Sequence, residues 1–292
     1  MTRSTWTRRG FLRTAATGAA LGFAPALVPA SALGRGLMAA PSERITVGLI
    51  GAGRQLFFKN WPQFAKMPDV QVVAVCDVDA WRLEQVHGAI EKHYAAQVAA
   101  GTHGGCKAYR DYREVLGRKD VDVVMIGTPD HWHVPLAIEA AQAGKDVSLE
   151  KPITRTIAEG QRLVRAIRQA GRVFRVDSEF RSEANFHRMA ELVHNGRIGK
   201  IKSLRVGVPA GDNVDCPPTP DMPVPEELDY ERWQGPAPRA AYTVNRVHPR
   251  QRIRPAGLDA RPGLLRRHDH QLGSAPVRHC PMVPRDGTDG AR

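Results

Sequence analysis

The chain has 292 residues, of which 42% are hydrophobic, and its formal net charge is +12 at pH 7. This length and apolar content allow one or two domains with buried cores, which excludes a disordered chain and a small disulfide-stapled scaffold. The charge is concentrated at the ends, because residues 1–43 carry five Arg and one acid and residues 250–292 carry nine Arg and four Asp. The part between them has no basic stripe with interleaved aromatics, so we expect no nucleic-acid partner.

The four cysteines are scattered along the chain, without C-x-x-C or metal-like spacing: Cys76, Cys106, Cys216 and Cys280. We therefore predict neither a disulfide framework nor a metal site. Cys76 lies in an apolar strand pattern, where we expect it to behave as a small buried hydrophobe.

The first 32 residues have the order of a secretory signal peptide: a charged start, a short apolar middle and a small-residue cleavage site. Thr7-Arg8-Arg9-Gly10-Phe11-Leu12-Arg13 precedes an Ala-rich run from Ala15 to Leu27, and Ala30-Ser31-Ala32 follows. The run is too short for a stable membrane span. Its paired arginines resemble a twin-arginine signal, so we expect export to the periplasm or the extracellular space by the twin-arginine machinery, with residues 33–43 as a linker. An N-terminal amphipathic helix is the alternative.

A dinucleotide-binding pattern begins at Arg44. Arg44–Ile50 is an apolar run of strand length, Gly51-Ala52-Gly53 follows it directly, and helical spacing resumes from Gln55 to Lys66. In such a unit the first glycine permits a tight turn, and the second lets the backbone approach a pyrophosphate at the helix N-terminus. Leu56 occupies the position of the usual third glycine, which predicts looser packing of the helix on the strand or a helix that stands further off.

An acid ends the next buried-strand pattern, Gln71–Asp77. Asp77 stands where a carboxylate would hydrogen-bond the adenosine ribose hydroxyls of a dinucleotide. This acid favours NAD over NADP, because it would repel a 2′-phosphate, although Arg82 is near enough in the sequence to keep both cofactors open. The alternative for Asp77 is a solvated residue at a strand end or a helix cap.

Strands and helices alternate through the rest of this region. We predict helices at 111–116, 134–143 and 156–170, and strands at 121–127, 146–149 and 172–176. Alternating elements with short connections predict an α/β fold, a doubly wound parallel sheet with helices on both faces. We therefore assign residues 44–176 to a Rossmann-type dinucleotide-binding domain.

Three segments of the sequence indicate a particular protein family. Gly51-Ala52-Gly53-Arg54-Gln55, Gly127-Thr128-Pro129-Asp130-His131-Trp132-His133 and Glu150-Lys151-Pro152 closely resemble the glucose–fructose oxidoreductase, inositol dehydrogenase and rhizopine-catabolism (Gfo/Idh/MocA) family. The similarity continues to Pro249 through the segments Asn195–Lys200, Leu228–Tyr230, Trp233–Pro236 and Tyr242. The resemblance implies an open α+β mixed-sheet domain, begun by residues 177–249, that receives a sugar or polyol and commonly forms contacts in a homo-oligomer.

The resemblance also implies site residues. Lys151 would lie beside the nicotinamide ring and assist proton transfer at the reacting hydroxyl, which suits hydride transfer to or from NAD or NADP. Around it, the nicotinamide-ribose side would be lined by Glu150, Thr128, Pro129 and His133. The rest of the predicted cofactor site consists of Gly51, Gly53, Arg54, Gln55 and Asp77. The alternatives are an exposed loop lysine for Lys151 and loop-packing or second-layer histidines for His131 and His133.

The composition changes after Pro249. Residues 250–292 contain five Pro and no Lys, Glu, Phe, Tyr or Trp, so they lack the alternating apolar strands of a sheet domain, and we expect an aberrant, disordered tail. A frameshift is our interpretation, because back-translation of 262–283 with one nucleotide dropped permits a segment that resembles the family's substrate-site histidine and aspartate. A natural basic extension is the alternative.

Taken together, these patterns predict an NAD(P)-dependent oxidoreductase that acts on a sugar or polyol hydroxyl. We expect its turnover to be impaired by the loss of most of the substrate domain. The alternative is a non-catalytic dinucleotide-binding or interaction protein.

Overall fold

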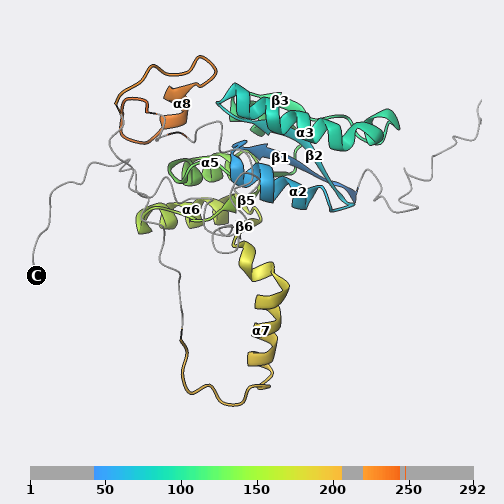
Figure 1. Cartoon of the computed structure of the whole chain (residues 1–292), viewed down its shortest axis with the longest axis vertical. Helices are drawn as coiled ribbons and strands as arrows, with labels where there is room; N and C mark the ends of the chain where they lie inside the picture. Colours follow the sequence, from blue (N-terminus) through green and yellow to red (C-terminus); the bar gives the residue numbers. More distant parts are fainter. Residues whose placement is uncertain (1–42, 206–219, 244–246, 248–292) are drawn as a thin grey trace, which may run out of the picture. The chain divides into compact units, whose positions relative to one another are not determined.

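The computed structural model describes residues 43–205, 220–243 and 247, and the described elements belong to one compact unit that begins at Ile45 (Figure 1). The predicted signal peptide and the predicted tail lie outside the described residues. The strands are β1 Ile45–Ile50, β2 Val70–Cys76, β3 Lys107–Tyr109, β4 Val123–Ile126, β5 Asp146–Glu150 and β6 Phe174–Asp177. The helices are η3 Leu56–Asn60, α2 Trp61–Phe64, α3 Ala80–Ala99, α4 Tyr112–Leu116, α5 Asp130–Gln142, α6 Ile157–Ala170, η4 Glu179–Ser182, α7 Ala184–His194 and α8 Tyr230–Gln234.

The six strands form one parallel sheet in the order β3-β2-β1-β4-β5-β6. This is the strand order of the doubly wound dinucleotide fold, in which the chain starts at the centre and winds outward in both directions. The predicted α/β sheet is confirmed, including the five strands that the sequence placed. Its carboxyl edge is where ligands of such folds bind.

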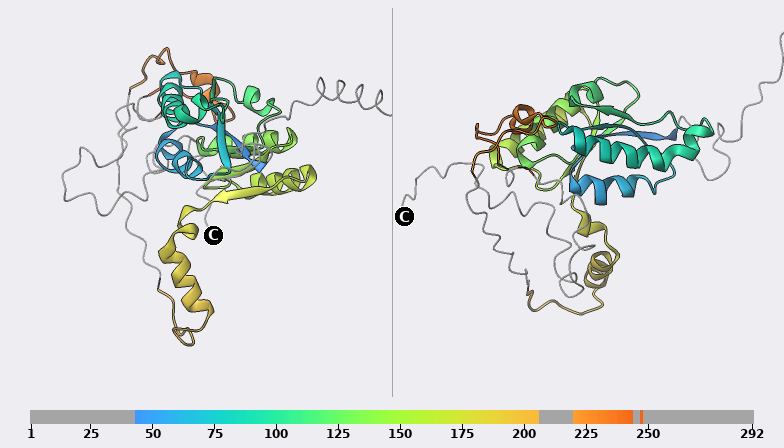
Figure 2. Two further views of the ribbon diagram at one scale, coloured as in Figure 1. Left: turned by 90° about the vertical axis from the view of Figure 1, so that its right-hand side faces the viewer. Right: turned by 45° about the horizontal axis from the view of Figure 1, so that its top comes forward.

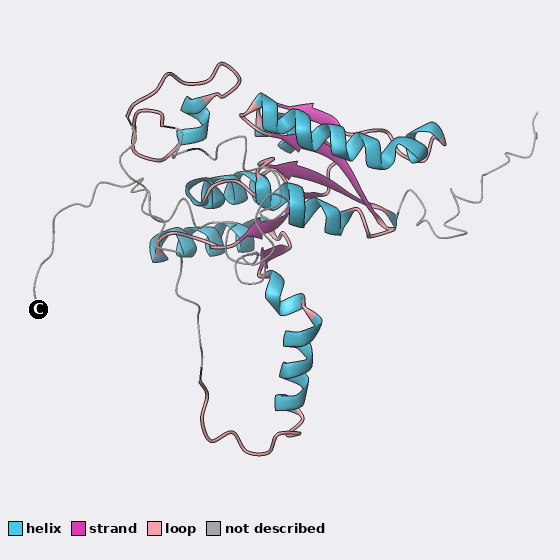
Figure 3. Ribbon diagram, in the orientation of Figure 1, coloured by secondary structure: helices cyan, strands magenta, loops and turns pink. Residues whose placement is uncertain are grey.

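Helices cover both faces of the sheet, as the views in Figures 2 and 3 show. On one face α4, α5 and α6 pack on the strands through residues such as Val115, Leu136 and Leu163. On the other face η3, α2 and α3 do so through Leu56, Trp61, Val86 and further apolar side chains. Every residue of β2, which lies between β3 and β1, is buried, which explains its largely apolar sequence.

Cys76 belongs to the first of these two clusters and is buried, which confirms its prediction as a small hydrophobe. Burial raises the pKa of its thiol. Among the described residues, no helix combines the length and the apolar character needed to cross a membrane.

Side-chain N-caps mark the start of α3, α4, α6 and α8. Thr156 and Glu159 form a capping box at the start of α6, and Gly171 ends that helix in the left-handed conformation at φ 63°. The structure differs from the prediction at α5, which begins at Asp130 instead of residue 134. Pro135 lies inside the first turns of α5 and obscures the helical signal, because proline is unfavourable there.

Candidate functional site

A cavity of about 510 Å³ opens at the carboxyl edge of the sheet, where β1, β2, β4 and β5 end. The ten residues that the sequence predicted for the site come from four separate strand ends, and all of them line this cavity. They are Gly51, Gly53, Arg54, Gln55, Asp77, Thr128, Pro129, His133, Glu150 and Lys151. The structure therefore brings the predicted residues together in one place.

The turn after β1 depends on its glycines. Gly51 has φ +95°, and a Cβ atom at this residue would lie 2.8 Å from the backbone of Gly127 and Thr128. A side chain is therefore excluded by both conformation and space. At Gly53, in contrast, a Cβ atom would meet nothing within 4 Å, and Gly53 lines the cavity. The space in front of the turn is open to a ligand, next to the start of a helix.

Leu56, which replaces the third glycine of the fingerprint, is fully buried at the start of η3. Its partner is Gly127 at the end of β4, where a Cβ atom would lie 3.5 Å from the Leu56 side chain. This is an ordinary van der Waals distance, so the contact with Leu56 does not require a glycine at residue 127. The helix packs closely here, in place of the looser packing that the sequence predicted.

Asp77 links the end of β2 to the glycine turn. Its Oδ2 accepts a hydrogen bond from the Ala52 backbone N–H at 2.6 Å, and its Oδ1 accepts one from the Asp79 N–H at 2.8 Å. Burial raises the pKa of Asp77 to about 6, although these two backbone hydrogen bonds oppose the shift. The side chain is half-buried and lines the cavity.

The cap of α3 is a different acid, Asp79, whose Oδ1 accepts from the backbone N–H groups of Trp81 and Arg82. Asp79 also forms an ion pair with the buried Arg82 guanidinium at 3.3 Å. The helix-cap alternative for Asp77 is therefore not the arrangement in the structure. The same ion pair engages the guanidinium of Arg82, the residue whose proximity in the sequence left NADP as an alternative cofactor.

Glu150 ends β5 on the other side of the glycine turn, and Lys151 directly follows it. Glu150 is buried, and its Oε1 accepts from Asn60 Nδ2 at 2.7 Å and from Gln55 Nε2 at 3.1 Å. Its Oε2 accepts from the Lys151 backbone N–H at 3.1 Å. Burial raises the pKa of Glu150, and the hydrogen bonds from Asn60 and Gln55 oppose this shift. The carboxylate is thus fixed beside Lys151.

His133 joins two parts of the cavity wall. It is 1% exposed, and its Nδ1 lies 2.7 Å from the Pro152 carbonyl oxygen while its Nε2 lies 2.9 Å from the Thr128 carbonyl oxygen. Because both ring nitrogens face backbone carbonyls, the ring ties the turn after β4 to the turn after β5. Thr128 Oγ1 is buried with no hydrogen-bond partner among the described residues, so a polar group of a ligand could satisfy it.

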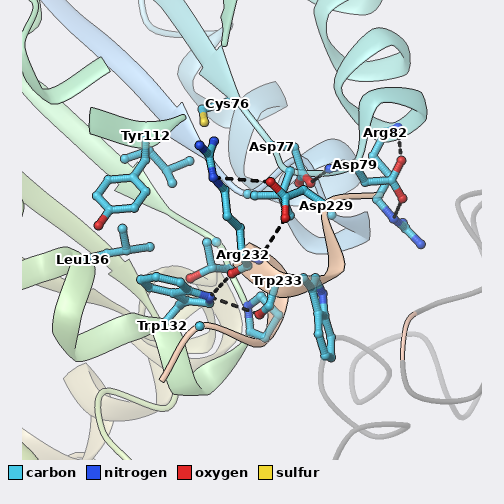
Figure 4. A pocket seen from close by; sticks show the side chains of 18 of the residues that line it. Cys76, Asp77, Asp79, Arg82, Tyr112, Trp132, Leu136, Asp229, Arg232 and Trp233 are labelled. Carbon is cyan, nitrogen blue, oxygen red and sulfur yellow. Dashed lines mark hydrogen bonds and ion pairs between the residues drawn. The ribbon is translucent and has the colours of Figure 1, made fainter. Parts of the chain in front are cut away.

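The cavity has a wall that the sequence did not predict, built by residues 227–235, which we call the clasp. The Ala80 N–H donates to the Glu227 carbonyl at 2.9 Å, and the Asp229 N–H donates to the Val78 carbonyl at 3.0 Å. Arg232 forms ion pairs with Asp229 at 3.3 Å and with Asp111 at 3.5 Å. Figure 4 shows this wall and the residues facing it: Asp229, Arg232, Trp233, Tyr112, Trp132 and Leu136.

The other end of the clasp is fixed to α5. His131 Nε2 donates to the Trp233 carbonyl at 2.8 Å, and Trp132 Nε1 donates to the Arg232 and Trp233 carbonyls at 3.0 and 3.1 Å. Burial lowers the pKa of His131, which favours the neutral form of its ring. The sequence had identified both segments as family motifs, but nothing in it showed that they contact each other.

Known proteins match the chain in the same region. Residues 45–178 match the Gfo/Idh/MocA family described as oxidoreductase family, NAD-binding Rossmann fold, and residues 214–254 match its C-terminal alpha/beta domain. Together these ranges span more than half of the chain. The chain belongs to the Gfo/Idh/MocA oxidoreductase family. The cavity described above therefore belongs to an NAD-binding Rossmann domain, whose cofactor is a nicotinamide dinucleotide.

The sequence identity to individual proteins is low, and each match covers only part of the protein. The chain is 26% identical over 196 residues to the uncharacterized oxidoreductase YrbE of Bacillus subtilis (strain 168), covering 66% of this chain and 49% of that protein. It is 34% identical over 129 residues to glycosyl hydrolase family 109 protein 1 of Shewanella sp. (strain ANA-3), covering 44% of this chain and 27% of that protein. The chain thus spans about half the length of the first relative and about a quarter of the second.

Among solved structures, the 3-ketoreductase KijD10 from Actinomadura kijaniata in complex with NADP is similar. The match has 25% identity and a TM-score of 0.46, and it covers 54% of this chain and 46% of that chain. The family assignment rests on the two family matches.

Proposed function

We propose that this family member binds NAD or NADP and transfers hydride at a carbon that bears a hydroxyl group in a sugar or polyol. The observation that carries the proposal is the position of Glu150 and Lys151, which lie at the end of β5 in the same cavity as the glycine turn and Asp77. A phosphate-binding turn, a ribose-binding acid and a lysine for proton transfer are thus combined in one site.

The residues fit the cofactor. The open space in front of Gly53 accommodates a pyrophosphate, and the unpartnered Thr128 hydroxyl can donate to an oxygen of the ligand. Asp77 offers its carboxylate to ribose hydroxyls at the end of β2. We propose NAD as the preferred form, because Asp77 would repel a 2′-phosphate and Arg82 is engaged by Asp79 at 3.3 Å.

The chemistry at the other end of the site requires a proton acceptor. When bound, the cofactor would supply the acceptor for the hydride that leaves the carbon of the alcohol. Lys151, as the neutral amine, would take the proton from the alcohol oxygen, which leaves a carbonyl product and a protonated lysine. Glu150, held by Asn60 and Gln55, keeps a carboxylate next to this lysine. His133 holds the turn that carries Lys151 against the turn after β4.

Mutation of Lys151 tests this proposal. The full chain is incubated with NAD or NADP and a panel of aldoses and polyols, and the absorbance of the reduced nicotinamide is followed. We expect Lys151→Ala to lower turnover roughly 100-fold or more with little change in dinucleotide affinity, because general acid–base groups contribute about that much. Lys119→Ala, an exposed lysine, is the matched control and should behave like the wild type. Equal turnover of Lys151→Ala and wild type would contradict the role of Lys151.

A second candidate function is cleavage of a glycosidic bond, which the names of several relatives favour, at 31–34% identity. Some glycosidases depend on NAD and do not use the usual pair of carboxylates. Such an enzyme returns the ring to its starting state, so it would release sugar from a glycoside without accumulating reduced nicotinamide. Accumulation in step with product would instead identify a dehydrogenase.

We also propose that the chain is exported by the twin-arginine route and that residues 250–292 result from a frameshift that weakens turnover. The support is the residue pattern of the two terminal segments. Resequencing of the coding DNA tests the frameshift, because a single-base change after Pro249 should restore an open frame. If resequencing gave the same coding sequence, the alternative of a non-catalytic dinucleotide-binding protein would be favoured.

A further inference from the structure

Two carboxylates and one amide form a network behind the cavity. Asn60, the last residue of η3, donates from Nδ2 to Glu150 Oε1 at 2.7 Å and to Asp177 Oδ2 at 2.8 Å. Glu150 and Asp177 are paired in register at the ends of the neighbouring parallel strands β5 and β6. The amide of Asn60 therefore holds two negative charges close together at the carboxyl edge of the sheet.

This arrangement determines which way the amide points. Asn60 is 5% exposed, and its Oδ1 has no hydrogen-bond partner among the described residues. A flipped amide would place Oδ1 against both carboxylates, which would be repulsive. Asp177 thus fixes Asn60 with one N–H directed at Glu150. Sequence reasoning had named neither Asn60 nor Asp177.

The network lies at the reacting end of the site. The fold binds a dinucleotide across the point where the strand order reverses, with its adenosine half on the β2 side, where Asp77 stands. The nicotinamide half must then lie over β4 and β5. Glu150 lines the cavity there, whereas Asn60 and Asp177 do not line it.

Neighbouring cations neutralise only part of the negative charge of Glu150 and Asp177. Lys151 directly follows Glu150, the last residue of β5, and lowers the pKa of that carboxyl, whereas Asp177 raises it. The Arg175 guanidinium lies 3.4 Å from Asp177 Oδ1, but its side chain is 59% exposed, so water screens much of its charge. Gln55, the remaining partner of Glu150, is neutral.

We propose that Asp177 and Asn60 are positioning residues that act through Glu150 to make the site favour the oxidised over the reduced cofactor. The inference rests on the proposed function. The oxidised nicotinamide ring carries a positive charge and the reduced ring carries none. A fixed negative charge beside the ring therefore stabilises the oxidised form selectively. The effect favours a site that starts its reaction from NAD and releases NADH.

The test is the ratio of the dissociation constants for NADH and NAD, measured by titration calorimetry on the full chain. Asp177→Asn removes the carboxylate that fixes the Asn60 amide, so Glu150 loses its oriented N–H donor, and the ratio is expected to fall roughly threefold to tenfold. Asn60→Ala removes the donor to Glu150 and should lower the ratio in the same direction. Asp146→Asn, the same change at the opposite end of β5, is the matched control and should leave the ratio unchanged.

An unchanged ratio in Asp177→Asn, with both cofactor forms bound, would overturn the inference while leaving the proposed function intact. A shift in Asp177→Asn without one in Asn60→Ala would also overturn it, since the charge would then not act through the amide. If the wild-type chain bound neither NAD nor NADH, the proposed function itself would fail, and the inference with it.

Discussion

Asp77 connects the glycine turn to the end of β2, and the connection depends on its charge. Its two oxygens accept from backbone N–H groups on both sides, so the acid is oriented before any ligand arrives. An ionised carboxylate is also the stronger acceptor for ribose hydroxyls. Burial opposes ionisation and raises the pKa of Asp77 to about 6. Cofactor binding and the protonation of this side chain are therefore coupled.

We expect the affinity for NAD to fall as the pH falls through about 6, because the ligand binds the ionised form of Asp77. The dissociation constant should be about tenfold higher one pH unit below this pKa than well above it. Calorimetric titration across this range measures the effect. Asp77→Asn should bind more weakly and show a much flatter pH profile. A profile for the variant that is as steep as that of the wild type would assign the pH dependence to another group.

Sequence reasoning succeeded for the site residues whose role follows from their position on one element. Gly51 and Gly53 follow a buried strand, and Lys151 follows another, so local pattern and family resemblance located them. Asn60 and Asp177 have no such signal, because their importance comes from three elements meeting around one amide. The π-helical turn of η3, which carries Asn60, is also not encoded in apolar spacing.

Among the elements, α8 and α5 interlock at a single glycine. Gly235 has φ +47°, and a Cβ atom there would lie within 2.1 to 2.8 Å of the Trp132 ring. The Trp132 indole can therefore reach the Arg232 and Trp233 carbonyls only because residue 235 has no side chain. The clasp and the cavity wall that it forms depend on this contact.

Gly235→Ala should displace the clasp and weaken NAD binding roughly tenfold, with a loss of about 1–3 kcal/mol in unfolding free energy from steric strain. Thermal unfolding and calorimetric titration of the full chain measure the two effects. Gly196→Ala is the matched control, because Gly196 has a similar φ of +64° but no atom within 4 Å of an added Cβ. It should lose stability only, with unchanged affinity. Equal affinities for the two variants would contradict the role of the clasp.

Some of the secondary-structure elements could be predicted from the sequence and others could not. Strands with long apolar runs, such as β1 and β2, were located, and the predicted helix at 156–170 agrees with α6 to within one residue. The strand β3 is only three residues long, and none of its residues is buried, so it has no apolar run to detect. The clasp was missed for a different reason, since Trp132 and Gly235 are far apart in sequence and only tertiary packing joins them.

For the whole molecule, the winding of the sheet explains why the site lies where it does. The chain starts at β1 and winds outward on both sides, so β1, β2, β4 and β5 all end at the carboxyl edge of the sheet. Residues between Ile50 and Val247 thereby line one cavity. Ligand binding should stabilise the folded chain, because only the folded chain assembles this cavity.

The most direct test of the account is calorimetric titration of NAD into the full chain with and without a side chain at Gly53. A Cβ atom there meets no protein atom within 4 Å, so Gly53→Val should fold normally but occupy the space of the pyrophosphate. The account predicts NAD binding by the wild type and by Gly88→Val, an exposed control on α3, and none by Gly53→Val at the same melting temperature. Binding by Gly53→Val at wild-type affinity, or no heat from the wild type with NAD or NADP, would contradict it.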